Sequence, residues 1–361
     1  MKRIVFTIAA LAFSLGHILV FFAWQKQLSL NETQTFNLAV IIIILAITSS
    51  LSSFFIYWRD NLVNRFIYLL SAIWSAILLN SLLLYIFFAI FAVFIDNTLL
   101  VFLYFILQIP LLLYEFYLAY FIKVRRFDAE IQNLNDFWHN KKILHISDIH
   151  LGPIWRSKHY KRIVKKINSL KPDAVFISGD FFDGVELDFS WLKISDYKIE
   201  AKYGVYYSLG NHDEDLGISR VKDLLKKTNF EILDDKMLVN NGLQIIGLIS
   251  GHGQKIDLEN KILEQINYDK KKPSILLFHE PKYMPEASKA GIDLQLSGHT
   301  HGGQLFPFNI ITSWLYKGNN YGVYRKNGLI LSVSSGIGTW GPPFRLGSQS
   351  EIVEIKLIKK E

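Results

Sequence analysis

Residues 143–150 read Ile-Leu-His-Ile-Ser-Asp-Ile-His, a short apolar run that leads directly into an Asp-x-His pair. Such a run, bounded by polar residues, is typical of a buried strand. The arrangement recurs twice. Ala-Val-Phe-Ile at 174–177 precedes Ser-Gly-Asp-Phe-Phe-Asp at 178–183, and the run 205–209 precedes Gly-Asn-His-Asp at 210–213. Each expected strand therefore delivers polar side chains at its carboxyl end.

Two later runs follow the same rule. Residues 274–278 precede His-Glu-Pro, and residues 292–296 precede Ser-Gly-His-Thr-His-Gly-Gly-Gln at 297–304. Helical periodicity at 160–170 and 218–227 gives the strand–helix alternation of a layered α/β domain, and the stretch 321–358 reads as strand-rich. Because sites in open α/β sheets form at the carboxyl ends of strands, we expect all five strand ends at one edge.

The residue types at these ends indicate a metal site. Asp, Asn and His suit divalent Mn, Fe or Zn, and the absence of cysteine excludes thiolate ligands and disulfides. A pair of divalent ions holds both oxygens of an in-line phosphoryl displacement and generates hydroxide at neutral pH. Neighbouring glycines allow tight turns and close backbone approach; they are Gly179, Gly210, Gly298, Gly302 and Gly303.

The ordered series Asp-x-His, Gly-Asp-x-x-Asp, Gly-Asn-His-Asp, His and Gly-His-x-His, within residues 145–304, resembles the calcineurin-like metallophosphoesterase superfamily. Residues 298–304, with Pro-Pro-Phe-Arg at 342–345, further resemble its bacterial membrane-associated branch. The resemblance implies a layered α/β sandwich and a phosphoric ester hydrolase with two metals.

The resemblance also implies roles for individual residues. The expected ligands of the first metal are Asp148, His150 and His301, those of the second are Asn211, His279 and His299, and Asp180 bridges the two. His212 would approach the phosphate and protonate the leaving oxygen, and Asp183 would orient His212 as a carboxylate–histidine pair. Arg345 is a candidate for binding the substrate phosphate; a surface ion pair is the alternative.

The N-terminal third is apolar instead. Four stretches are long enough to cross a membrane as helices, at residues 4–24, 36–58, 66–95 and 99–122. We therefore expect a transmembrane anchor of about four helices at 1–126, a connector at 127–140 and the metallophosphoesterase domain at 141–361. His17 and Glu115 are intramembrane ionisable residues, which mark either helix contacts or a transport path.

Positive charge in the short loops predicts the orientation of this multi-pass cell-membrane protein. Lys2 and Arg3 precede the first stretch, Arg59 and Arg65 lie between the second and third, and basic residues follow the fourth. This alternation places the catalytic domain in the cytoplasm.

The leading hypothesis is hydrolysis of a phosphodiester or pyrophosphate bond in a lipid-linked or membrane-proximal substrate. The alternatives are a membrane receptor or transporter whose soluble domain binds a phosphorylated ligand, and a membrane-tethered nuclease of the same superfamily. The net charge of +7 permits nucleic acid as a partner, but lysine clusters suit anionic membrane lipids as well.

Trp155 and Trp340 are expected either to line an apolar mouth of the site or to pack in the core. Of the other histidines, His145 is expected to be structural, and His139, His159 and His252 to lie at the surface or in loops.

Overall fold

The computed structural model describes residues 2–91, 97–184, 188–249, 258 and 268–360. It divides into two compact units. The first comprises residues 1–117 with 341–344, and the second comprises residues 118–340 with 345–361. Each unit is considered by itself below.

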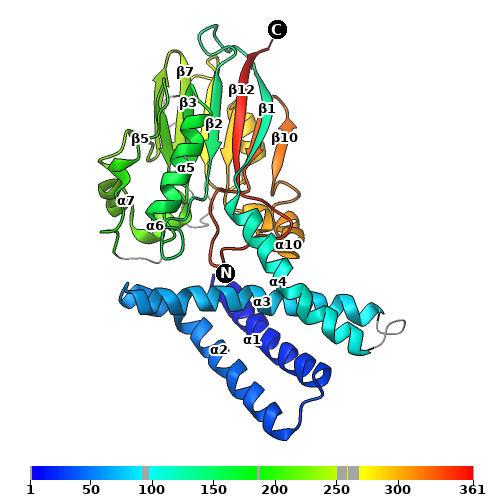
Figure 1. Ribbon diagram of the computed structural model, residues 1–361. Helices are drawn as coiled ribbons and strands as arrows, with labels where there is room; N and C mark the ends of the chain where they lie inside the picture. Colours follow the sequence, from blue (N-terminus) through cyan, green and yellow to red (C-terminus); the bar gives the residue numbers. More distant parts are fainter. Residues whose placement is uncertain (1, 92–96, 185–187, 250–257, 259–267, 361) are drawn as a thin grey trace. The chain divides into compact units, whose positions relative to one another are not determined.

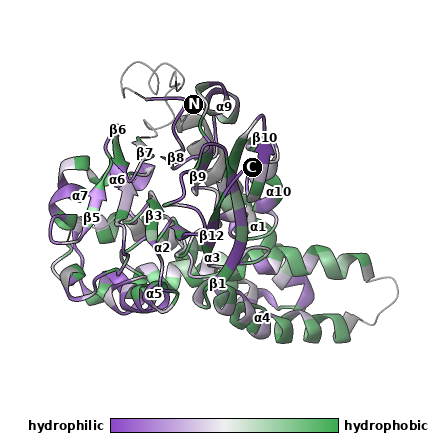
Figure 2. Cartoon of the chain, turned by 90° about the horizontal axis from the view of Figure 1, so that it is seen from above, coloured by the Kyte–Doolittle hydropathy of each residue, from purple (hydrophilic) through white to green (hydrophobic). Residues whose placement is uncertain are grey.

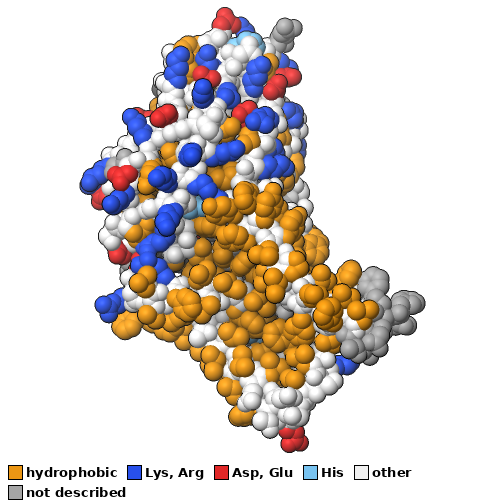
Figure 3. Space-filling view, viewed as in Figure 1, with side chains coloured by type: hydrophobic (Ala, Val, Ile, Leu, Met, Phe, Trp, Pro, Cys, Tyr) orange, Lys and Arg blue, Asp and Glu red, His pale blue; other side chains and the backbone are white. Residues whose placement is uncertain are grey.

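The N-terminal part of the chain forms four long helices (Figure 1): α1 (Lys2–Gln27), α2 (Glu32–Trp58), α3 (Leu62–Phe91) and α4 (Asn97–Tyr120). Asn31 caps α2 in a reciprocal arrangement with Gln34, which satisfies free main-chain donors at the first turn. Pro110 lies inside α4. Apolar residues dominate these helices (Figure 2), and apolar side chains cover most of their visible surface (Figure 3).

Three of the helices, rather than the four expected, are long and apolar enough to cross a membrane within the described residues. They contain the segments Glu32–Ser52, Leu62–Ile90 and Leu99–Tyr120. The expected first span does form helix α1, but its side chains are described only from residue 13 onward. That stretch is shorter than the roughly 20 residues that a span needs. The end of the expected third span, at 92–95, lies outside the described residues.

The two ionisable residues singled out in the apolar helices make helix–helix contacts. The amide of Asn80 on α3 donates to the Glu115 carboxylate on α4 at 3.0 Å. The indole of Trp74 donates to Nε2 of His17 at 2.9 Å. Both contacts pair a polar group with a partner inside an apolar bundle, as buried polar side chains require.

Within its described residues, the second unit contains two six-stranded sheets. The first has the order β1-β12-β2-β3-β4-β5, formed by β1 (Lys123–Ile131), β12 (Glu351–Lys359), β2 (Lys142–Ile146), β3 (Ala174–Ser178), β4 (Val205–Ser208) and β5 (Phe230–Ile232). The second has the order β10-β11-β9-β8-β7-β6, formed by β10 (Gly322–Lys326), β11 (Leu329–Val333), β9 (Leu294–Ser297), β8 (Ser274–Phe278), β7 (Leu243–Leu248) and β6 (Lys236–Asn240).

Alternating side chains place the sheets in the middle of the unit. In β3, Ala174 and Phe176 join an apolar core with residues of the second sheet, such as Ile275 and Leu296. Val175 and Ile177 point the other way, into a core with helix α5 (Ser157–Ser169). Helix α5 buries one side, with Tyr160, Ile163, Val164 and Ile167, and exposes Lys158, Lys161 and Lys165. On the second sheet, α9 (Met284–Ala290) packs in the same way. The result is the predicted layered α/β sandwich.

The structure differs from the sequence-based expectation in two respects. The five ligand-bearing strands belong to two sheets, β2, β3 and β4 to one and β8 and β9 to the other, rather than to one edge. In addition, part of the expected connector at 127–140 belongs to strand β1, which pairs with β12 along its whole length. Alternate residues of β1, among them Ala129 and Ile131, are buried in the core.

Candidate metal centre

The predicted ligands converge where the carboxyl ends of the two sheets meet. Asp148 and His150 follow β2, Asp180 follows β3, and Asn211 begins helix α6 (Asn211–Leu216) after β4. From the second sheet, His279 follows β8, and His299 and His301 follow β9. All are buried except Asn211 and His299, which are partly exposed.

Among the described residues, three groups of His and Asp side chains, formed by six of these ligands and His212, have ligand atoms within 4.8 Å of one another. The groups are Asp148, His150 and His301; Asp180, His279 and His299; and His150, Asp180 and His212. The first two correspond to the two predicted metal positions. The third joins them, because it shares His150 with one group and Asp180 with the other.

Asp180 lies between the groups, as a bridging carboxylate must. Its Oδ1 accepts the main-chain N–H of His212 at 2.9 Å. Its Oδ2 lies 2.9 Å from Nε2 of His279 and 3.9 Å from Nε2 of His150. One carboxylate oxygen is therefore fixed by the backbone, while the other faces imidazoles of both groups.

The first group fits a cation. Nε2 of His150 lies 3.1 Å from Nε2 of His301, and Oδ1 of Asp148 lies 3.5 Å from the same His301 atom. Two imidazole nitrogens and a carboxylate oxygen therefore face one another, which suits a shared divalent ion.

The second group fits a cation for the same reason. Nδ1 of His279 lies 2.7 Å from the Ser178 carbonyl, which accepts its proton and leaves the Nε2 lone pair towards Oδ2 of Asp180. Nε2 of His279 makes no hydrogen bond to a described residue. Nδ1 of His299 lies 2.8 Å from Oδ1 of Asn211.

The charged side chains of the two groups shift one another's pKa values strongly. Burial alone would lower the pKa of His279, but Asp180 and Asp148 outweigh burial and raise that pKa to about 10. Burial and the charge of His279 together lower the pKa of His299 to about 4. Perturbation of neighbouring groups in opposite directions is typical of functional sites.

The backbone is strained at the same residues. Asp148, His150, Asp180, His299 and His301 all have left-handed φ angles, between 49° and 71°. Such angles are uncommon for residues other than glycine and cost free energy that the surrounding structure must supply. Five of the seven predicted ligands thus occupy a backbone region found mostly at turns and functional sites.

Glycine is required beside two of the carboxylates. A Cβ on Gly210 would collide with Oδ1 of Asp180 and lie 2.5 Å from its main-chain nitrogen. A Cβ on Gly298 would collide with Oδ2 of Asp148. The predicted close approach of glycine backbone to the ligands is confirmed at these positions.

His212 and Asp183 are neighbours, but not as a carboxylate–histidine pair. Nδ1 of His212 donates to the main-chain carbonyl of Asp183 at 2.7 Å. The Asp183 carboxylate lies instead 3.4 Å from Nδ1 of His150. The expected orienting contact on His212 therefore comes from the backbone, and the carboxylate approaches a predicted metal ligand from its far side.

Arg345 is placed differently from the expectation. Its side chain is fully buried, and its guanidinium donates to the main-chain carbonyls of His301, Ser335, Gly336 and Gly338. These donors are not available to a substrate phosphate, and because Arg345 is buried it does not form the surface ion pair that was the alternative, at least with any residue that the structure describes. It ties the His301 loop to residues 335–338, of which Gly338 in turn donates to the carbonyl of Asp148 at 2.7 Å.

The remaining candidates divide between core and surface. His145 is buried, with Nε2 2.8 Å from the Ser178 hydroxyl, as expected of a structural residue. The surface position expected for His159 is wrong, because the Trp155 ring packs against its ring at 4.2 Å and only 6% of the residue is exposed. Trp155 is packed, whereas Trp340 is exposed with its ring 6.2 Å from that of His212. His139 is partly exposed, and His252 lies outside the described residues.

One neighbour of the centre has no counterpart in the sequence analysis. Tyr316 lies with its ring 6.0 Å from that of His299, just after helix α10 (Phe308–Leu315). Tyr316 lies at the end of the stretch that follows the Gly-Gly-Gln motif. The sequence of that stretch did not indicate that it returns to the metal centre.

Comparison with known proteins agrees with this geometry. The model of the calcineurin-like phosphoesterase family matches residues 141–303. An uncharacterized metallophosphoesterase of Campylobacter jejuni is 37% identical over 245 residues, which cover 66% of this chain and 64% of that protein. One from Aquifex aeolicus is 32% identical over 249 residues, covering 67% and 94%.

A bovine relative is described as a transmembrane protein with a metallophosphoesterase domain. It is 31% identical over 253 residues, which cover 64% of this chain and 56% of the relative. The chain therefore spans less than two thirds of the length of both the bovine and the Campylobacter relatives.

Proposed function

This chain is a member of the calcineurin-like phosphoesterase family, and on that premise we propose that it hydrolyses a phosphodiester or pyrophosphate bond in a lipid-linked or membrane-proximal substrate. Metal-dependent hydrolysis of a phosphoester follows from the family and from the His/Asp clusters. The choice of substrate rests on three helices that are apolar enough to span a membrane.

The observation that carries the proposal is the pair of ligand groups joined through Asp180 and His150. We assign Asp148, His150 and His301 to one divalent ion, Asn211, His279 and His299 to a second, and Asp180 to both. Mn, Fe and Zn all suit these oxygen and imidazole ligands. Bound ions would neutralise the phosphate oxygens and lower the pKa of water.

His212 acts on the leaving group in this proposal. Its Nδ1 proton is held by the Asp183 carbonyl, so that Nε2 is the nitrogen free to carry and deliver a proton. A proton on Nε2 would pass to the leaving oxygen of the substrate as the ester bond breaks.

The catalytic domain is proposed to face the cytoplasm. Arg59 and Arg65 precede or begin α3, whereas Lys123, Arg125 and Arg126 follow α4. Two candidate spans separate these basic groups, so both groups lie on the same side of a membrane that α3 and α4 cross. The positive-inside rule assigns that side to the cytoplasm.

Hydrolysis of a chromogenic phosphodiester by detergent-purified full-length protein, with Mn²⁺ and after chelation, tests the proposal. We expect activity that requires metal and is lost in Asp180→Asn, but is kept in Asp223→Asn, where the carboxylate is exposed beside Lys226. Equal activity in wild type and Asp180→Asn would refute the assignment. A panel containing DNA, lipid phosphodiesters and pyrophosphates then separates a nuclease from a lipid hydrolase. Metal-dependent binding without turnover would favour the receptor alternative.

A further inference from the structure

Helix α10 is apolar and yet uncovered. It contains Phe308, Ile310, Ile311, Trp314 and Leu315, and it has no buried residue in the described chain. Trp314 is 77% exposed and Ile310 is 59% exposed. Phe306, just before the helix, is also exposed. Single exposed apolar residues are ordinary, but a contiguous set on one short helix marks an interaction surface.

The helix is held rigidly beside the metal centre. Gly303 has a φ of 86°, and a Cβ there would collide with the backbone of Asn309 at the start of the helix. At the other end, the Thr300 hydroxyl donates to the Asn320 carbonyl at 2.5 Å, and the Asn320 amide donates to the Asn309 carbonyl at 3.3 Å. Thr300 lies between the predicted ligands His299 and His301. Whatever covers α10 is therefore positioned next to the centre.

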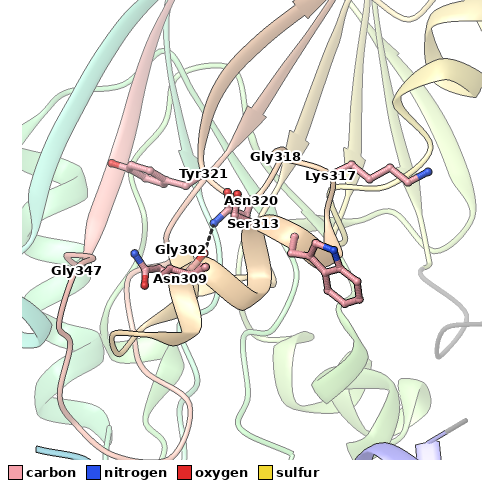
Figure 4. A pocket seen from close by; sticks show the side chains of 10 residues that line it. Gly302, Asn309, Ser313, Lys317, Gly318, Asn320, Tyr321 and Gly347 are labelled. Carbon is pink, nitrogen blue, oxygen red and sulfur yellow. Dashed lines mark hydrogen bonds between the residues drawn. The ribbon is translucent and has the colours of Figure 1, made fainter. Parts of the chain in front are cut away.

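The composition of the surface indicates its partner. No charged residue occurs between Leu305 and Tyr316, and the first one afterwards is Lys317. Lys317 and Tyr321 line an open cavity of about 860 Å³ beside α10, together with the polar Asn309, Ser313 and Asn320 and the apolar Ile310 and Trp314 (Figure 4). Aromatic and aliphatic side chains, with amide, hydroxyl and ammonium groups beside them, are typical of a helix that lies in a membrane interface.

We propose that α10, with Phe306 and Lys317, is a membrane-docking surface that seats in the interface of a phospholipid leaflet. The same chain carries three candidate membrane spans, which would tether the domain to a bilayer. Because tethering raises the effective concentration of lipid near α10, even a weak affinity of α10 for lipid would keep it bound. The apolar side chains enter the acyl boundary, and the Lys317 ammonium meets lipid phosphates. The inference extends the proposed function, because docking would present the metal centre to phosphoesters at the lipid surface, but it does not require turnover.

The cysteine-free chain allows a direct test. Ile310→Cys and Val239→Cys each place one thiol for an environment-sensitive fluorophore. Val239 lies on β6, is 56% exposed, and so matches Ile310 in type and exposure. The full-length labelled proteins are placed in nanodiscs of phosphatidylcholine and phosphatidylglycerol, with or without a nitroxide-bearing lipid. Each variant is first compared with wild type for its thermal midpoint.

We expect the label at 310 to be blue-shifted and quenched by the nitroxide lipid at least about twofold more strongly than the label at 239. Equal quenching at the two positions would overturn the proposal. So would a blue shift at 310 that depends on protein concentration but not on the quencher, because a second copy would then cover the helix.

If Ile310→Cys lowers the thermal midpoint, intrinsic tryptophan quenching in wild type and Trp314→Phe replaces the label. The tryptophans of the apolar helices, such as Trp58 and Trp74, are quenched in both proteins. We therefore expect the variant to differ from wild type by the loss of one quenched component, and emission that is lost only from the unquenched fraction would refute docking. Phosphodiester hydrolysis by wild type is a separate measurement. Failure of that activity would refute the proposed function and leave the docking result standing.

Discussion

Nδ1 of His212 lies 2.7 Å from the main-chain carbonyl of Asp183, whereas the carboxylate of Asp183 lies 3.4 Å from Nδ1 of His150. Asp183 thus contacts His212 with its main chain and His150 with its side chain. The backbone contact fixes the ring of the proposed proton donor. The carboxylate contact lies behind a predicted metal ligand and would orient it and raise its basicity.

Substitution can separate these two contacts. Asp183→Asn keeps the carbonyl but removes the charge beside His150. We expect Mn²⁺ affinity to fall by about 10- to 100-fold, with kcat at saturating Mn²⁺ little changed. A metal titration of phosphodiesterase activity measures both quantities.

His212→Asn should behave in the opposite way. Loss of the proton donor is expected to lower kcat by about 10²- to 10⁴-fold, while Mn²⁺ affinity, measured by calorimetry, stays closer to that of wild type. If Asp183→Asn at saturating metal loses as much kcat as His212→Asn, then the carboxylate serves the chemistry directly and our division of roles is wrong.

Arg345→Lys tests the buried guanidinium. Lysine carries the same charge but has fewer donors and no planar fork, so it cannot serve the carbonyls of residues 301, 335, 336 and 338 together, and some of them lose their partner. Each unsatisfied buried acceptor costs roughly 1–3 kcal/mol. We expect a lower thermal midpoint and weaker metal binding through the displaced His301 loop. A wild-type midpoint with an increased KM alone would instead restore the substrate role first expected of Arg345.

Gly210→Ala tests the close approach to Asp180. The new Cβ would collide with the carboxylate, so metal-dependent activity should be lost. Gly217→Ala is the matched control, because a Cβ there meets nothing within 4 Å although its φ is 101°. That variant should lose roughly 1–3 kcal/mol of stability through backbone strain and keep its activity. Loss of activity in both variants would point to general misfolding instead.

Acid should destabilise the α/β unit through two buried histidines outside the metal centre. Burial and the charge of Arg125 lower the pKa of His145 to about 3, and burial and Arg162 do the same for His159. The folded state keeps both neutral, while the unfolded chain protonates them below about pH 6.5. The contribution of these two histidines to the free energy of unfolding is therefore complete above pH 6.5 and is lost as the pH falls towards 3.

This linkage predicts a loss of about 2 kcal/mol per histidine between pH 7 and pH 5. His159→Gln can still accept from Arg162 but cannot titrate, so its stability should fall less steeply over that range. Unfolding midpoints of both proteins at several pH values check this prediction. Titration of the metal ligands affects both proteins equally, so it cancels when the two midpoints are subtracted. Parallel curves for wild type and His159→Gln would contradict the prediction.

The local features of the centre could be predicted from sequence because each depends on a few consecutive residues. A buried strand followed by Asp-x-His delivers Asp148 and His150 whatever the strand pairs with. The assignment of strands to two sheets could not be predicted, since it depends on pairings such as Val353 with His145. The same limit applies to Arg345. Nothing in Pro-Pro-Phe-Arg indicates that carbonyls of two distant loops converge on its guanidinium.

The sequence also could not show whether a residue acts through its side chain or through its main chain. The motif Gly-Asp-x-x-Asp places Asp183 near His212, but only the path of the backbone decides whether carboxylate or carbonyl faces the ring. His159 was expected at the surface or in a loop, and the packing of the Trp155 ring against it, which the sequence does not indicate, buries it instead.

The position of β12 has a consequence for how the domain is made. This strand lies between β1 and β2 and pairs with both, although the ribosome synthesises it after every other described strand. Until residue 359 leaves the ribosome, the first sheet has an open gap with two unpaired edges, which are sites for mispairing and aggregation. The first sheet therefore stays incomplete until β12 has been synthesised. Chains that stop before residue 351 should be degradation substrates rather than weak enzymes.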